Sequence, residues 1–89
     1  MPLAPTPAFR AAEPMRLRLF QRDDCPLCDE ALGVLAAARL PEFESVWIDD
    51  DHALEARYGL RVPVLRDEAR DAELDWPFDA GAVRAFLGT

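Results

Sequence analysis

Apolar and polar residues alternate over the first clearly patterned stretch of the chain. Leucines at positions 17 and 19 are interleaved with arginines at positions 16 and 18, and Phe20 follows. A period of two residues is typical of a strand that buries one face, so this stretch predicts a strand. Further runs of branched and aromatic residues predict strands over residues 43–49, 62–65 and 72–76.

The segment after the first strand predicts a helix that begins at Pro26. Proline suits the first turn of a helix because its missing N–H has no intrahelical acceptor there. Cys28, Leu32 and Leu35 follow at the spacing of one buried helix face. Pro41 is expected to end this helix.

Two shorter helices are predicted farther along the chain. Asp50 or Asp51 can cap a helix over residues 52–58, and Gly59 supplies its C-terminal stop. Asp79 can cap a last helix near the C-terminus. Carboxylates at these positions accept the backbone N–H groups that a helix start leaves unpaired.

The predicted order of elements is β-α-β-α-β-β-α. A strand, a helix and a second strand in succession imply a parallel right-handed crossover, and the last two strands form an antiparallel hairpin. The expected fold class is therefore α/β, with a four-stranded mixed sheet and helices on both of its faces. We expect the acidic residues of the hairpin to form a solvated edge. These residues are Asp67, Glu68, Asp71 and Glu73.

The composition is that of one small globular domain. The chain has 89 residues, of which 51% are hydrophobic and 30% are charged, and this is enough for a single core. Residues 1–14 hold four of the eight prolines and show no periodicity, which predicts a flexible tail ahead of a domain at residues 15–89. Met15 is an alternative start.

Charge and targeting patterns narrow the partners that we expect. The net charge is −7, which disfavours phosphate backbones and anionic membrane surfaces, so we expect no nucleic-acid or membrane partner. No apolar run approaches the ~18 residues of a membrane span, and the N-terminus lacks the apolar centre of a signal peptide. We therefore expect a cytoplasmic monomer. The ten arginines without a single lysine indicate GC-rich, bacterial coding.

Both cysteines lie in the stretch DDCPLCDE, residues 23–30. Two residues separate Cys25 from Cys28, a spacing typical of a redox dithiol or of half a metal site. A zinc site needs four ligands, and beyond the cysteines the chain offers only His52 and carboxylates. A structural disulfide across so short a loop would stabilise the fold by only about 2 kcal/mol. A zinc site and two unrelated buried thiols remain alternatives to a redox pair.

Four carboxylates flank the two cysteines, namely those of Asp23, Asp24, Asp29 and Glu30. A helix N-terminus lowers the pKa of a thiol because the helix dipole favours the thiolate. Each carboxylate opposes this effect by about 0.5 kcal/mol at a separation of about 8 Å. We therefore expect Cys25 to keep a pKa close to that of an ordinary thiol, and the pair to be reducing. The same carboxylates favour a neutral or basic protein partner over anionic glutathione.

The element order, with a CPxC motif after the first strand and Val62-Pro63 at the opening of the third, resembles the glutaredoxin branch of the thioredoxin fold. This resemblance covers residues 16–88. The segments LCDEAL, IDDD, YGLRVPVL and LDWPFD are similar to those of small bacterial glutaredoxin-like proteins. The resemblance therefore implies a thioredoxin/glutaredoxin-like fold.

The resemblance also implies roles for the residues of the CPxC motif. Cys25 is implied to be the exposed nucleophile, and Cys28 the resolving thiol one helical turn deeper. Pro26 and Leu27 lie between them and are expected to contact the substrate. Leu27 replaces the aromatic residue that is usual at this place in the family.

More distant residues are implied to bind the substrate as well. Pro63 is expected to be a cis-proline that leaves the backbone of Val62 open to pair with an extended substrate. Arg22 occupies the place of a basic residue that helps to bind glutathione in the family. Asp79 lies in a segment that only loosely matches the family's binding site for the γ-glutamyl end of glutathione.

The resemblance thus implies a thiol–disulfide oxidoreductase with no bound cofactor and no metal. Its expected partners are a protein disulfide or thiol as substrate and a thioredoxin-type reductant, with glutathione as the less favoured reductant. The alternative function is a non-catalytic binding or adaptor module of the same fold, which holds a partner without turnover.

Overall fold

The computed structural model describes residues 16–40 and 42–88. The predicted tail at residues 1–14, the alternative start at Met15 and the helix stop at Pro41 lie outside these residues. Within them, the elements follow the predicted order and are β1 (Leu17–Gln21), α2 (Pro26–Ala37), β2 (Glu44–Trp47), α3 (His52–Tyr58), β3 (Val64–Asp67), β4 (Ala72–Asp75) and α4 (Ala80–Leu87). None of these helices has the length and apolar character that crossing a bilayer requires.

The strands of the described residues form one mixed sheet in the order β2-β1-β3-β4. β1 runs parallel to β2 and antiparallel to β3, and β4 completes a hairpin with β3. In this register Phe20 of β1 lies between Val46 of β2 and Val64 of β3. The predicted four-stranded mixed sheet is therefore confirmed, and β1 is one of its two central strands.

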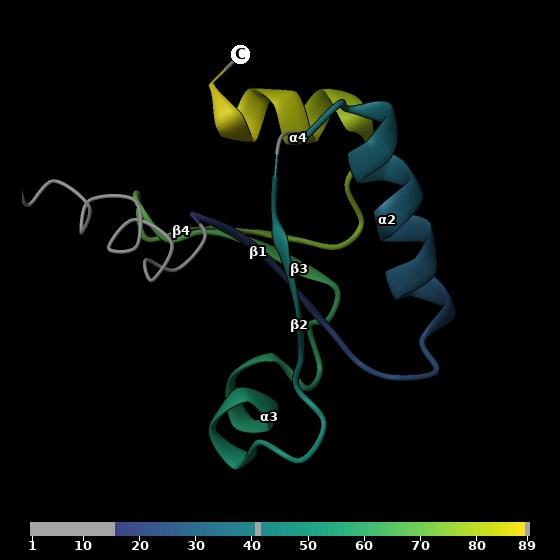
Figure 1. Cartoon of the computed structure of the whole chain (residues 1–89), viewed down its shortest axis with the longest axis vertical. Helices are drawn as coiled ribbons and strands as arrows, with labels where there is room; N and C mark the ends of the chain where they lie inside the picture. Colours follow the sequence, from purple (N-terminus) through teal and green to yellow (C-terminus); the bar gives the residue numbers. More distant parts are fainter. Residues whose placement is uncertain (1–15, 41, 89) are drawn as a thin grey trace, which may run out of the picture.

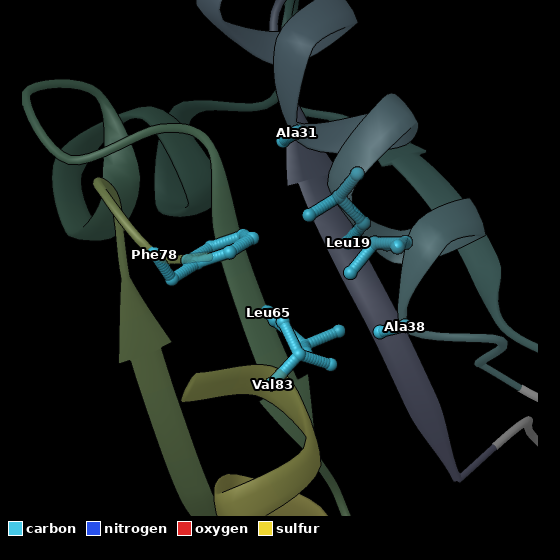
Figure 2. Packing of buried hydrophobic residues seen from close by; sticks show 7 residues of the cluster. Leu19, Ala31, Ala38, Leu65, Phe78 and Val83 are labelled. Atoms are coloured by element: carbon cyan, nitrogen blue, oxygen red, sulfur yellow. The ribbon is translucent and has the colours of Figure 1, made fainter. Parts of the chain in front are cut away.

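Helices cover both faces of the sheet, as predicted. Leu19 of β1 packs in one core cluster with residues of α2 and α4, among them Leu35 and Val83. Figure 2 shows the side chains of Leu19 and Val83 directed toward the same interior space. The neighbouring Phe20 points to the opposite face, where its ring stacks on that of Tyr58 from α3. In Figure 1, α3 accordingly lies apart from α2 and α4.

The buried face of α2 differs from the predicted one by one residue. Cys28 and Leu35 are buried as expected, but Ala31 rather than Leu32 lies between them in the core. The observed spacing of three and then four residues is equally helical, and the small side chain of Ala31 lets the helix lie close to the sheet. Leu32 is half-buried at the edge of this contact.

The third strand begins and ends two residues later than predicted. It spans Val64–Asp67 rather than residues 62–65. Pro63 has no N–H to donate to a neighbouring strand, and pairing with β1 starts only at Val64. Val62 and Pro63 therefore precede the strand, and the peptide bond between them is cis.

The prediction that the acidic residues of the hairpin form a solvated edge was wrong for Asp67 and Glu73, whereas the side chain of Asp71 is 83% exposed, as expected. Asp67 is fully buried and accepts hydrogen bonds from the side chains of Arg16 and Arg70. The hydrogen bond from Arg16 holds the pKa of Asp67 well below its usual range, although burial acts to raise it. Glu68 and Asp71 each form an ion pair with an arginine of β3.

Glu73 is the most heavily paired of these carboxylates. It accepts a hydrogen bond from the hydroxyl of Tyr58 at 2.7 Å and forms ion pairs with Arg57, Arg61 and Arg66. Burial, together with the hydrogen bond to Glu73, raises the pKa of Tyr58 to about 12. The inner face of the hairpin therefore packs on α3 through charged and aromatic groups rather than facing water.

Candidate active site

Cys25 lies between β1 and α2 and caps the helix. Its backbone is extended, and its sulfur accepts a hydrogen bond from the backbone N–H of Cys28 at 3.2 Å. Its carbonyl accepts from the N–H groups of Cys28 and Asp29. Pro26 occupies the first turn, as predicted. The sulfur of Cys25 thus lies where helix N–H groups favour a thiolate.

The two cysteines differ in their access to solvent. They are joined in a disulfide, with their Cα atoms 5.2 Å apart. Cys28 is only 2% exposed, whereas Cys25 is half-buried. Leu27 between them is 46% exposed. A partner molecule can therefore reach the sulfur of Cys25, while that of Cys28 faces the core.

The loop between β1 and α2 is tied to the loop that follows β2. The backbone N–H of Asp23 donates a hydrogen bond to the carboxylate of Asp49 at 2.9 Å. Asp24 then adopts a left-handed backbone conformation with φ of 56°, which aspartate tolerates better than most residues. This turn carries the chain from the sheet to Cys25.

Arg22 connects the same loop to α3. Its guanidinium donates two hydrogen bonds to Glu55, at 2.6 and 2.9 Å, and one to the backbone oxygen of Gly59 at 3.0 Å. The hydrogen bond from Arg22 lowers the pKa of Glu55. A Cβ atom at Gly59 would lie 2.5 Å from the backbone oxygen of Glu55 and 3.4 Å from the Arg22 side chain. Glycine at this position therefore leaves room for the backbone and carboxylate oxygens of Glu55.

Val62 and Pro63 lie at the same end of the sheet as the disulfide. The antiparallel register pairs Phe20 with Val64, so the residues just before β3 adjoin the end of β1 that leads to Cys25. Pro63 is buried and Val62 is half-buried. The sheet therefore brings the two sequence motifs to one edge.

A cavity of about 220 Å³ opens beside the disulfide. Four of the predicted site residues line it, namely Arg22, Cys25, Pro26 and Cys28. The other predicted residues, Leu27, Val62, Pro63 and Asp79, are not part of its lining. Asp79 instead caps α4, where its carboxylate accepts the backbone N–H of Ala82 at 2.7 Å.

The family described as Glutaredoxin-like domain (DUF836) matches residues 16–88. The chain belongs to this family. A search of curated proteins found no match to it.

Solved structures with similar folds agree with this assignment. The X-ray structure of target protein XcR50 from X. campestris is 64% identical, with a TM-score of 0.78, and the match covers 81% of this chain and 95% of that chain. Protein Ne2328 from Nitrosomonas europaea, solved by NMR, is 32% identical, with a TM-score of 0.68 and coverage of 83% and 92%. The predicted thioredoxin-like fold is therefore confirmed for this glutaredoxin-like domain.

Two residues of the cavity in this glutaredoxin-like domain were not predicted from the sequence. Gln21 is only 3% exposed, and its amide nitrogen has no hydrogen-bond partner among the described residues. Trp47 is 52% exposed and pairs with Gln21 across the parallel strands β1 and β2. The sequence does carry a signal for Gln21. By the two-residue period of a strand, Gln21 lies on the same face as the inward-facing Leu17 and Leu19, a few residues before Cys25.

The zinc alternative finds no support at the cysteines. Within residues 16–40 and 42–88, no three histidine, cysteine, aspartate or glutamate residues are arranged to share a metal ion. His52 lies at the start of α3, in a helix that packs on the sheet face opposite to Cys28.

Proposed function

We propose that this glutaredoxin-like domain is a thiol–disulfide oxidoreductase in which Cys25 attacks and Cys28 resolves. The observation that carries the proposal is the asymmetry of the pair, with Cys25 accessible at a helix N-terminus and Cys28 buried one turn later. The nucleophile must reach a partner, whereas the resolving thiol needs only to reach Cys25.

The reduced dithiol would act in two steps. The thiolate of Cys25 attacks one sulfur of a substrate disulfide, forming a Cys25–substrate disulfide and releasing the other substrate sulfur as a thiolate. Cys28 then loses its proton and attacks the sulfur of Cys25, which releases the second substrate thiolate and forms the Cys25–Cys28 disulfide. Two electrons pass from the domain to the substrate. A dithiol reductant returns them by the same exchange in reverse.

Residues around the disulfide would position the substrate in this scheme. The exposed Leu27 and the turn at Pro26 offer an apolar contact beside Cys25. Val62, which precedes Pro63 outside the β ladder, would present its backbone carbonyl to an extended substrate chain, because its N–H already donates to the carbonyl of Tyr58 at 3.0 Å. A protein dithiol of thioredoxin type is the reductant that we favour over glutathione, because Glu55 already binds the guanidinium of Arg22.

Exchange with a small neutral disulfide tests this proposal. We expect the reduced wild type to react with bis(2-hydroxyethyl) disulfide, releasing two thiols per chain and ending as the Cys25–Cys28 disulfide. The Cys28→Ser variant should stop at a stable mixed disulfide on Cys25, and the Cys25→Ser variant should react no faster than a buried thiol. Persistent exchange in Cys25→Ser, or wild-type thiols that do not exchange with the disulfide at a measurable rate, would contradict the proposal.

A binding or adaptor module is the second candidate function. It is favoured by the exposed large apolar side chains of the described residues, which are Leu27, Trp47 and Leu60. Leu27 belongs to the CPxC motif, and Trp47 lines the cavity beside it. An adaptor would bind a partner through this surface while its thiols stay inert, so the exchange experiment separates the two functions.

A further inference from the structure

Charge is distributed unevenly over this domain. Many arginines are neutralised in ion pairs away from the cysteines, for example Arg16 with Asp67 and Arg61 with Asp75. Another group of carboxylates has no ion-pair partner among the described residues. This acidic cluster consists of Asp23, Asp24, Asp29, Glu30, Asp49, Asp50 and Asp51.

The acidic cluster lies at one edge of the sheet. Its members come from the segment that follows β1 and from the segment that follows β2. These strands are parallel, so their C-terminal ends meet at the edge where Cys25 lies. The net negative charge of the chain is therefore concentrated around the disulfide.

Three carboxylates of the cluster line the cavity beside Cys25, those of Asp23, Asp24 and Asp29. Arg22 is the one basic residue of the lining, and its charge is balanced by Glu55. The half-exposed indole of Trp47 and the side chain of Leu32 form the apolar part of the cavity wall. An apolar wall with a negative opening suits a side chain that has an aliphatic stem and a cationic end.

Gln21 provides an independent indication that the cavity takes a ligand. Gln21 is only 3% exposed and lines the cavity. Its amide nitrogen has no hydrogen-bond partner among the described residues. A buried donor without an acceptor costs stability. A small rotation of this buried amide toward the cavity would let it donate to a backbone carbonyl of a bound chain, and a chain bonded through a cysteine to Cys25 lies within reach of the cavity.

We infer that this cavity is a specificity pocket for a lysine or arginine side chain adjacent to the reacting cysteine of a protein substrate. The inference rests on the proposed function, since the substrate is held through its sulfur at Cys25. The basic side chain lies along Trp47 and Leu32 with its charge among the three carboxylates. The same carboxylates repel glutathione, which carries two carboxylates of its own. The pocket thereby selects basic protein substrates over glutathione.

Three peptide disulfides of equal length test the inference. They carry lysine, glutamine or glutamate next to the cysteine, and the rate constant of each with the reduced wild type is measured at low and high salt. We expect the lysine peptide to react about tenfold faster than the glutamine peptide at low salt, and the glutamate peptide to be slowest. The preference should shrink as salt rises.

Variants locate the preference in the pocket. Changing Asp23, Asp24 and Asp29 together to asparagine should remove most of the preference for lysine, and asparagine also tolerates the left-handed backbone at Asp24. Glu30→Gln is the matched control, because Glu30 belongs to the acidic cluster but does not line the cavity; it should keep most of the preference. Trp47→Ala should slow the lysine peptide more than the glutamine peptide.

The outcomes separate this inference from the proposed function. Fast reaction with all three peptides at equal rates overturns the pocket and leaves the oxidoreductase intact. Equal losses in the triple variant and in Glu30→Gln also overturn the pocket, since they assign the preference to the general field of the cluster. No measurable exchange with any of the three peptides overturns the proposed function and the pocket with it.

Discussion

Arg22 donates two hydrogen bonds to Glu55, and this pair joins the end of β1 to α3 next to the disulfide. The contact is half-exposed, so its effect on global stability is small. We expect Arg22→Ala and Glu55→Ala each to lower the midpoint of thermal unfolding slightly, with the larger loss for Arg22→Ala because it also removes the hydrogen bond to Gly59. The double variant should lose no more than the larger single loss, because either change breaks the same pair. Thermal unfolding of the four proteins measures this, and additive losses would show that the residues act separately.

Glu73 makes the stability of the domain depend on pH. Burial acts to raise its pKa, but hydrogen bonds from Arg61 and Tyr58 outweigh burial and hold the pKa at about 2, below the ordinary 4.5. A carboxylate with a lowered pKa in the folded state stabilises the fold above its unfolded pKa, and that stability is lost as the pH falls toward the folded pKa.

We therefore expect Glu73→Gln to lower the free energy of unfolding by about 2 kcal/mol at pH 7. The difference from the wild type should shrink between about pH 4.5 and pH 2. Urea unfolding at pH 7 and at pH 3 measures it. Glu42→Gln, at an exposed carboxylate, is the control and should match the wild type at both values. A pH-independent difference at position 73 would assign the loss to packing instead of charge.

Glu73 illustrates what the sequence could not reveal. The order of elements and the cap at Asp79 were predicted correctly, and Asp51 was one of two candidates for the cap of α3, because periodicity and helix starts depend on residues within a few positions. Glu73, in contrast, pairs with Arg57 of α3 as well as with its own hairpin. Such a pairing depends on how distant elements pack, and an acidic turn looks solvated when it is considered by itself.

In the candidate site, too, local features were predictable from the sequence and contacts between distant elements were not. The CPxC motif and its helix start were recognised from local sequence, whereas the cavity needs β1, β2 and α2 together. Trp47 reaches the cavity beside the disulfide because β2 lies next to β1 and parallel to it. The sequence therefore predicted the cysteine pair and missed part of the cavity wall beside it.

Asp79 offers a test between two roles for one carboxylate. Its oxygen caps α4 by accepting the N–H of Ala82, and the family resemblance also suggests contact with glutathione. Asp79→Ala should lower the free energy of unfolding by about 1 kcal/mol, while Asp79→Asn should keep most of the cap. We expect neither variant to change the exchange rate with glutathione disulfide. A slower rate in Asp79→Asn at unchanged stability would instead support glutathione binding by the carboxylate.

The carboxylates beside Cys25 should make the dithiol more reducing. They disfavour the thiolate of the reduced state and thereby favour the disulfide. At a pH above the ordinary thiol pKa of about 8.5, where the thiolate is the reduced form, changing Asp23, Asp24 and Asp29 to asparagine should raise the reduction potential by up to about 30 mV, if each contributes about 0.5 kcal/mol at about 8 Å. Equilibration with glutathione or dithiothreitol buffers measures the shift. An unchanged or lower potential would show that these charges do not act on the sulfurs.

The central claim is that Cys25 and Cys28 form a working redox pair, and its most direct test is a redox titration of the wild type. The protein is equilibrated in buffers of defined potential, and its free thiols are alkylated and counted by mass spectrometry. We expect a reversible two-electron transition with a midpoint at or below about −270 mV, the value typical of thioredoxin. Cysteines that cannot be cycled reversibly between dithiol and disulfide would contradict it.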